Sequence, residues 1–165
     1  MTNKERALMV AEKAHLNQTY DIYPYMYHIK QVVKIVEELG YDESIIIASI
    51  LHDTLEDTPL SYNDIKKAFG KEVAEIVYCV TDELGRNRNE RKEKTYPKIR
   101  SNWKATVVKI CDRIANINQS KEYNRELYEM YKKEHSLFCS SLMSKDHPIE
   151  ETTRAWTLLN FEMGI

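Results

Sequence analysis

The sequence is poor in cysteine and contains no paired cysteine motif. Its 165 residues include three cysteines, Cys79, Cys111 and Cys139, which lie in helix-like contexts and form no CxxC pair. The spacing therefore fits neither a disulfide framework nor a zinc knuckle. Reduced thiols of this kind are typical of a cytoplasmic protein, and we expect this location.

The chain also lacks a long apolar run and a strong charge of either sign. No segment reaches the roughly 18 apolar residues that a membrane span needs, and the start MTNKERALMV has no apolar signal-peptide core. The formal net charge is only -2, from 24 basic and 26 acidic residues. Because nothing in this balance points to a nucleic acid or a membrane, we expect neither as a partner.

Helical periodicity is what the sequence has in abundance. Apolar residues recur at i, i+3 and i+4, and no stretch shows convincing strand alternation. We expect helices at roughly 2–18, 28–39, 42–57, 61–70, 73–84, 103–119, 121–145 and 148–163. The polar, basic segment 85–102 contains Pro97, and we expect a loop with one or two helical turns there. The fold class is all-α, and the length indicates a single domain over 1–165.

The segment LHDTLED, residues 51–57, places a histidine and three carboxylates at the end of an apolar run. The preceding residues IIIASI are apolar almost all round, so this helix should lie at the centre of the fold. On a continued helix, one side would carry four polar side chains: His52, Asp53, Glu56 and Asp57. Buried like charges need a cation nearby, and imidazole with carboxylates is a ligand set for a first-row divalent metal.

A lone His-Asp pair also arises by chance, as a satisfied core histidine beside a solvated acidic helix end. Two further features favour the metal. His28 begins a helix whose other face is apolar, and Asp112 interrupts an apolar helix and shares a face with Asn116. The sequence thus offers a histidine, a His-Asp pair and a distant aspartate on helices that we expect to be buried.

This ordered set is the pattern of the HD-domain metal-dependent phosphohydrolases. The chain resembles the hydrolase domain of the RelA/SpoT family and its small single-domain relatives, the small alarmone hydrolases and metazoan SpoT homologues. The resemblance spans residues 11–118, through AEKAHLNQ, PYMYHIKQV, ASILHDTLEDT, IKKAFGKEVAEIV with VTDE, ERK and VKICDRIANI. Residues 121–165 lie outside it and are expected to form C-terminal helices that supply core or oligomer contacts.

The resemblance implies a helical bundle that hydrolyses a nucleotide with Mn²⁺ or another first-row divalent metal. Four side chains are implied as metal ligands: His28, His52, Asp53 and Asp112. Two carboxylates are implied to act on the attacking water: Glu56 and Asp57. Four residues are implied to hold the nucleotide and its phosphates: Asn116, Arg88, Arg91 and Lys92. Three histidines lack an acidic partner pattern and are expected to be non-ligands: His15, His135 and His147.

The reaction implied is removal of the 3′-pyrophosphate from the alarmone guanosine 3′,5′-bis(diphosphate), ppGpp. The chain departs from the pattern at Thr19 and Tyr20, where alarmone hydrolases usually carry a basic residue. Four alternatives therefore stay open: a phosphatase acting on NADPH, one acting on another (deoxy)nucleotide, a non-catalytic nucleotide-binding HD protein, and a metal-free helical scaffold. The length leaves no room for a synthetase domain, so we expect no synthesis, and a homo-oligomer is left open.

Overall fold

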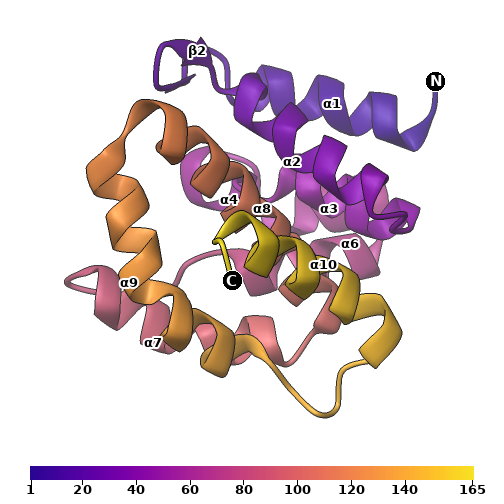
Figure 1. Cartoon of the computed structure of the whole chain (residues 1–165). Coiled ribbons are helices and arrows are strands. Elements are labelled where there is room, and N and C mark those ends of the chain that lie inside the picture. The colour runs from indigo at the N-terminus through magenta and orange to yellow at the C-terminus, as the bar shows by residue number, and fades with distance from the viewer.

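The computed structural model describes all of residues 1–165 and is built almost wholly of α-helices (Figure 1). The helices are α1 (Asn3–Ala14), α2 (Met26–Glu38), α3 (Glu43–Leu51), α4 (Thr54–Asp57), α5 (Tyr62–Phe69), α6 (Lys71–Val80), α7 (Arg88–Arg100), α8 (Trp103–Tyr123), α9 (Arg125–Leu142) and α10 (Ile149–Glu162). The all-α prediction is confirmed. None of these helices has both the length and the apolar character that crossing a membrane requires.

A small antiparallel hairpin connects α1 and α2. Strand β1 (Thr19–Tyr20) pairs with β2 (Tyr23–Pro24), and Tyr20 lies opposite Tyr23. The sequence predicts no strand, so this hairpin is a correction. It is missed because two residues per strand are too few to show the alternation by which a strand is recognised.

Local sequence signals begin and end several helices where expected. The Thr2 side chain accepts the N–H of Glu5, whose carboxylate accepts the N–H of Thr2 in return. Ser61 and Asp64 make the same reciprocal capping box at the start of α5. Gly70 ends α5 at φ 94°, a conformation that glycine adopts without the steric cost of a Cβ atom.

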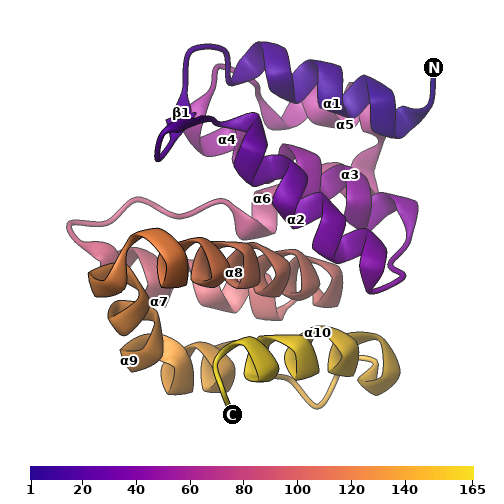
Figure 2. The ribbon, with the colours of Figure 1, turned by 45° about the horizontal axis from the view of Figure 1, so that its top comes forward.

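Helix α8 is the central element. It packs against α2, α3, α6, α7, α9 and α10, and Figure 2 shows it between a layer that contains α1 to α5 and a layer formed by α9 and α10. Its apolar face is buried as the periodicity predicts, through Val107, Ile110, Cys111, Ile114 and Ile117. Because Asp112 lies on the same helix, the burial of α8 carries a carboxylate into the interior.

The expected helix 42–57 is divided into α3 and α4. Asp53 has φ -101° and ψ 0°, outside the α-helical region, so the regular helix stops at Leu51 and a single turn resumes at Thr54. The Thr54 hydroxyl donates to the carbonyl oxygen of Leu51 at 2.7 Å and satisfies an acceptor that the break would leave free. The break lies at His52 and Asp53, the two residues singled out by the sequence.

The segment 85–102 differs most from its prediction, because it forms the helix α7 rather than a loop. Asn87 caps the first turn through its side-chain oxygen, and Pro97 lies inside the helix. Proline inside a helix costs about 3 kcal/mol. Burial of Tyr96 and Ile99 against the rest of the protein offsets this cost, and sequence signals of local origin cannot anticipate such a tertiary contribution.

Smaller corrections concern helix ends. Helix α6 ends at Val80, and Leu84, which the sequence pattern assigned to its apolar face, is 89% exposed. Helix α8 continues to Tyr123, and α9 begins after Asn124, whose side chain accepts the N–H of Leu127. In α9 and α10 five large side chains are buried: Tyr131, Phe138, Leu142, Trp156 and Leu159. Leu137 of α9 and Tyr123, the last residue of α8, are exposed.

A charged cluster joins α7, α8 and α9. Glu134 of α9 accepts hydrogen bonds from Arg88 of α7 at 2.8 and 3.1 Å and from Arg113 of α8 at 2.9 Å. The Arg113 guanidinium lies 4.6 Å from the ring centroid of Tyr131 and 4.3 Å from that of Phe138. Arg113 is only 4% exposed, so its charge depends on Glu134 for compensation.

We expect Glu134→Gln to lower the free energy of unfolding at pH 7 by roughly 3 kcal/mol, because it leaves the Arg113 charge buried and unpaired. Burial raises the pKa of Glu134, but hydrogen bonds from Arg88 and Arg113 outweigh it and lower the pKa to about 2. This stabilisation is therefore complete above the ordinary glutamate pKa and is lost as the pH falls through about 2.

Urea unfolding of both proteins in steps from pH 7 to pH 2 measures this difference. Glu129→Gln is the control, because Glu129 lies on the same helix with a side chain that is 39% exposed. The control should change the free energy of unfolding by less than about 0.5 kcal/mol. Equal effects of the two substitutions would contradict the role assigned to Glu134.

Candidate metal centre and active site

Four side chains from separate parts of the chain meet in the interior. Nε2 of His28, on α2, lies 2.9 Å from Oδ1 of Asp112 on α8. Nε2 of His52 lies 3.2 Å from the same oxygen and 3.0 Å from Oδ2 of Asp53. The two imidazoles are 2% and 4% exposed. The structure therefore brings together the four residues that the sequence pattern selects, and we call them the histidine–carboxylate cluster.

The imidazole of His52 is oriented by the backbone of α3, the helix that ends directly before it. Its Nδ1 is 2.7 Å from the carbonyl oxygen of Ser49, and because a carbonyl only accepts, Nδ1 is the donor in this bond. The other ring nitrogen, Nε2, is buried and has no hydrogen-bond partner. It faces the carboxylates of Asp53 and Asp112. The donor set and this unpartnered nitrogen fit a divalent metal ion.

The carboxylates of the cluster favour positive charge at the same place. Burial lowers the pKa of His52, but the Asp53 and Asp112 carboxylates outweigh it and raise the pKa well above its usual value. Burial raises the pKa of Asp112, but the effect of His52 is larger and opposite. The pKa of Asp112 therefore lies well below its usual value. A metal ion would supply the positive charge and release the His52 proton.

Glu56 and Asp57 lie on the single turn α4, directly after the cluster. One carboxylate oxygen each from Asp53, Glu56 and Asp57 lie within 4.8 Å of one another. Glu56 Oε1 accepts the backbone N–H of Asp82 at 2.5 Å, which fixes its direction. Burial raises the pKa of both Glu56 and Asp57. Carboxylates with raised pKa values beside a metal-binding cluster are suited to accept a proton.

A cavity of about 150 Å³ is bordered by three residues of the cluster, by Glu56 and by two lysines. Its wall consists of His52, Asp53, Glu56, Val80, Asp82, Lys92, Val108, Lys109 and Asp112. The sequence pattern did not select Lys109 or Asp82. Lys109 lies one turn before Asp112 on α8, with Nζ 3.6 Å from Oδ2, so its spacing from Asp112 was an available signal. Asp82 had no such signal, because only the fold carries it to this wall.

The basic residues of α7 are largely engaged with the protein itself. Arg88 pairs with Glu134, and Nζ of Lys92 lies 3.1 Å from both carboxylate oxygens of Asp82. Lys92 also faces the cavity, whereas Arg91 is half-buried on the same helix. Contact of Arg88, Arg91 and Lys92 with phosphate stays a prediction.

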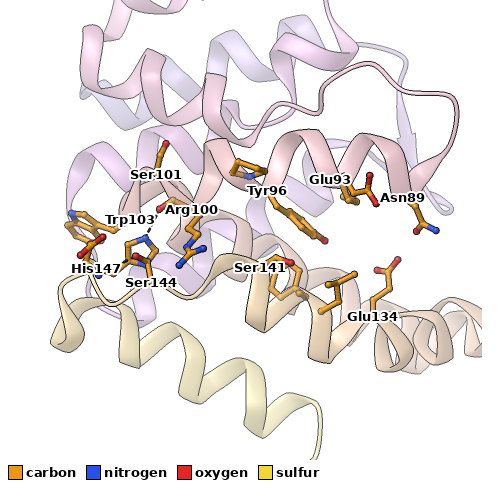
Figure 3. Close-up of a pocket in the computed structure, with 15 residues that line it drawn as sticks. Asn89, Glu93, Tyr96, Arg100, Ser101, Trp103, Glu134, Ser141, Ser144 and His147 are labelled. Carbon is orange, nitrogen blue, oxygen red and sulfur yellow. Dashed lines mark hydrogen bonds between the residues drawn. The ribbon is translucent and has the colours of Figure 1, made fainter.

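A larger cavity, of about 880 Å³, lies between α7 and α9 (Figure 3). Tyr96, Phe138 and Trp103 contribute aromatic surface to it, and His147 is hydrogen-bonded to the carbonyl oxygen of Arg100 at 2.7 Å. The groups of three or more possible metal ligands occur elsewhere, at the histidine–carboxylate cluster and on α4. The chemistry expected from the sequence therefore belongs to the smaller cavity.

The histidines expected to be non-ligands lie outside the cluster. Nδ1 of His15 is 2.8 Å from Oε1 of Gln18, and Nε2 of His135 is 3.2 Å from Oδ1 of Asn160. His147 is engaged with a backbone carbonyl, as described above. Each of the three thus has a hydrogen-bond partner outside the histidine–carboxylate cluster.

A model of the HD domain matches residues 7–138 of the chain. The chain belongs to the HD domain family. The matched range contains the whole histidine–carboxylate cluster as well as Glu56 and Asp57.

Two curated relatives of this HD protein carry names that describe ppGpp chemistry. It is 35% identical over 97 residues to the guanosine-3′,5′-bis(diphosphate) 3′-pyrophosphohydrolase MESH1 of Drosophila melanogaster, covering 57% of this chain and 54% of MESH1. It is 32% identical over 142 residues to the bifunctional (p)ppGpp synthase/hydrolase SpoT of Escherichia coli strain K12, covering 76% of this chain and 20% of SpoT. The chain thus spans about half of one relative and a fifth of the other.

Solved structures share the fold. A metazoan orthologue of SpoT, described as hydrolysing ppGpp, aligns with a TM-score of 0.77 at 23% identity, over 98% of this chain and 96% of that chain. A protein of Listeria monocytogenes EGD-e aligns with a TM-score of 0.65 at 25% identity, over 85% and 98% of the two chains. Together with the family match, these confirm the expected helical HD fold and the resemblance to alarmone hydrolases.

We expect a divalent metal to stabilise this HD protein through the cluster. At an Mn²⁺ concentration 100 times the dissociation constant, binding raises the free energy of unfolding by about 2.7 kcal/mol. Asp112→Asn should remove most of this gain, because Oδ1 of Asp112 lies against both histidines. Thermal unfolding with and without Mn²⁺ measures it, and an undiminished gain in Asp112→Asn would place the ion elsewhere.

Proposed function

We propose that the protein is a divalent-metal-dependent nucleotide phosphohydrolase, and that its substrate is ppGpp, from which it removes the 3′-pyrophosphate. The carrying observation is that three residues of the histidine–carboxylate cluster, His52, Asp53 and Asp112, border one cavity together with Glu56 and two lysines. The names of the MESH1 and SpoT relatives support the choice of substrate. The packing of α10 on α8 supports treating 1–165 as one HD hydrolase domain, and we propose the cytoplasm as its location.

The metal would be held by His28, His52, Asp53 and Asp112, with Mn²⁺ as the proposed ion. When bound, such an ion polarises a phosphoryl oxygen and lowers the pKa of a coordinated water. Glu56, held by the backbone N–H of Asp82, would accept the proton of the attacking water. Asp57 would assist from the same turn of helix, since its carboxylate lies within 4.8 Å of that of Asp53.

The substrate's negative charge would be met by the basic side chains around the cavity. Lys92 and Lys109 both line it, and cations placed there would neutralise charge on the pyrophosphate as the phosphoryl group transfers. Arg88 and Arg91 would extend this positive charge along α7. Asn116, whose amide nitrogen is 3.2 Å from Asp112, would contact the nucleotide next to the metal. Water attack would yield guanosine diphosphate and pyrophosphate.

One observation favours a different nucleotide substrate. The Tyr20 hydroxyl donates to Asn116 Oδ1 at 2.6 Å, so the asparagine side chain is already occupied by a residue that carries no charge. A substrate that presents a single phosphate group to this side of the cavity, such as the 2′-phosphate of NADPH or the phosphate of a (deoxy)nucleoside monophosphate, would need less positive charge there than the pyrophosphate of ppGpp.

A substrate panel with Mn²⁺-loaded protein tests the proposal. We expect pyrophosphate release from ppGpp, loss of turnover on chelation and recovery on adding Mn²⁺. Glu56→Gln should lower kcat by roughly 10²–10⁴-fold, with Glu129→Gln as the matched control at wild-type rate.

Other outcomes separate the alternatives. Release of phosphate from NADPH or from a deoxynucleotide, without release of pyrophosphate from ppGpp, would make that nucleotide the substrate in place of ppGpp. Tight nucleotide binding without any turnover would make the protein a binding module. Full activity in metal-free His52→Ala would overturn the metal mechanism.

A further inference from the structure

Tyr25, at the start of α2, contacts the histidine–carboxylate cluster from outside. Its hydroxyl donates a hydrogen bond to Oδ2 of Asp53, the oxygen that also lies 3.0 Å from Nε2 of His52. Aromatic side chains commonly stack on a ring or pack against apolar surface. The hydroxyl of Tyr25 instead faces a carboxylate that we propose as a metal ligand.

Tyr20 reaches the second carboxylate of the cluster through Asn116. Its hydroxyl donates to Asn116 Oδ1 at 2.6 Å, and Asn116 Nδ2 in turn donates to Asp112 Oδ1 at 3.2 Å. The Tyr20 ring also stacks on the imidazole of His28, with centroids 4.5 Å apart and planes inclined by 25°. Each carboxylate of the cluster therefore accepts a hydrogen bond from a neutral donor that is not itself a proposed ligand.

Neutral donors suit this position for a physical reason. A phenol or amide fixes the direction of a carboxylate and leaves its charge in place, whereas a hydrogen-bonded lysine or arginine would offset the negative charge that attracts a metal ion. The ammonium of Lys109 lies 3.6 Å from the other oxygen of Asp112, Oδ2, beyond hydrogen-bond distance. A phenol keeps its proton near neutral pH, so the Tyr25 hydroxyl acts as a donor there.

Both tyrosines are held by the surrounding structure. The Tyr25 ring lies 4.6 Å from that of His15, and its backbone N–H donates to the carbonyl oxygen of Gln18 at 3.0 Å. The hairpin that carries Tyr20 is tied to α8 by Asp21, which accepts a hydrogen bond from Gln119 at 3.0 Å. Donors anchored in this way can position a carboxylate instead of following its movements.

We propose that Tyr25 is a positioning residue of the metal centre, which holds the Asp53 carboxylate in the orientation that binds the ion, and that Tyr20 does the same for Asp112 through Asn116. This inference rests on the proposed metal site and adds two residues that the HD motif does not contain. It gives the connection between α1 and α2 a role in metal affinity.

Mn²⁺ binding to the full chain, without substrate, tests the inference. Electron paramagnetic resonance of free Mn²⁺ gives the dissociation constant for the wild type, Tyr25→Phe and Tyr27→Phe. We expect Tyr25→Phe to weaken Mn²⁺ binding by about 10–100-fold, the usual effect of losing such an outer partner. Tyr27→Phe is the matched control, because Tyr27 lies in the same segment and stacks on Tyr23 with centroids 4.0 Å apart.

Co²⁺ in place of Mn²⁺ provides a readout that a packing role would not change. Its ligand-field absorption should shift in Tyr25→Phe, and in Tyr20→Phe to a smaller extent, while Tyr27→Phe keeps the wild-type spectrum. Equal Mn²⁺ affinity and equal Co²⁺ spectra for Tyr25→Phe and Tyr27→Phe would overturn the inference and leave the metal site intact. A wild-type protein that binds neither ion would instead overturn the metal centre of the proposed function.

Discussion

The buried carboxylate of Asp112, the partly buried carboxylate of Asp53 and two buried imidazoles lie in contact at the centre of this protein, and their charges have to balance. Oδ1 of Asp112 lies 2.9 Å from Nε2 of His28 and 3.2 Å from Nε2 of His52. Such a group of charges is costly in a protein interior unless the geometry compensates it. Helices α2 and α8 and the break between α3 and α4 each contribute to the cluster, so the packing of the central helices and the position of the charges depend on each other.

The interruption between α3 and α4 gives this centre its shape. A continuous helix would keep the four polar residues of LHDTLED on one regular face. The break at Asp53 instead leaves His52 buried and bonded to the backbone of α3, while Glu56 and Asp57 lie on a separate turn near the surface. The break thereby places His52 and Asp53, which would hold an ion, in different surroundings from the carboxylates that would accept a proton. Only three positions separate Asp53 from Glu56.

Helix α7 contributes Lys92 to the wall of the smaller cavity. Its lysines fasten the segment that follows α6: Lys92 pairs with Asp82, and Lys98 donates to the carbonyl oxygen of Thr81 at 2.9 Å. Asp82 in turn directs the Glu56 carboxylate through its backbone N–H. The basic segment, which in the sequence looks like a loop attracting phosphate, therefore also supports the position of an acidic residue on α4.

The sequence alone determines the helical class, most helices and the residues of the cluster. Periodicity gives the buried faces of α2 and α8, because the 3.6-residue repeat is a local property of the chain. The motif gives His28, His52, Asp53 and Asp112, because the chemistry of their side chains can be read without coordinates. The tertiary structure decides what depends on contacts between distant segments: the helix around Pro97, the approach of Asp82 to the cavity, and the hydroxyl of Tyr25 beside Asp53. These contacts arise only when separate helices pack together, and no local pattern encodes them.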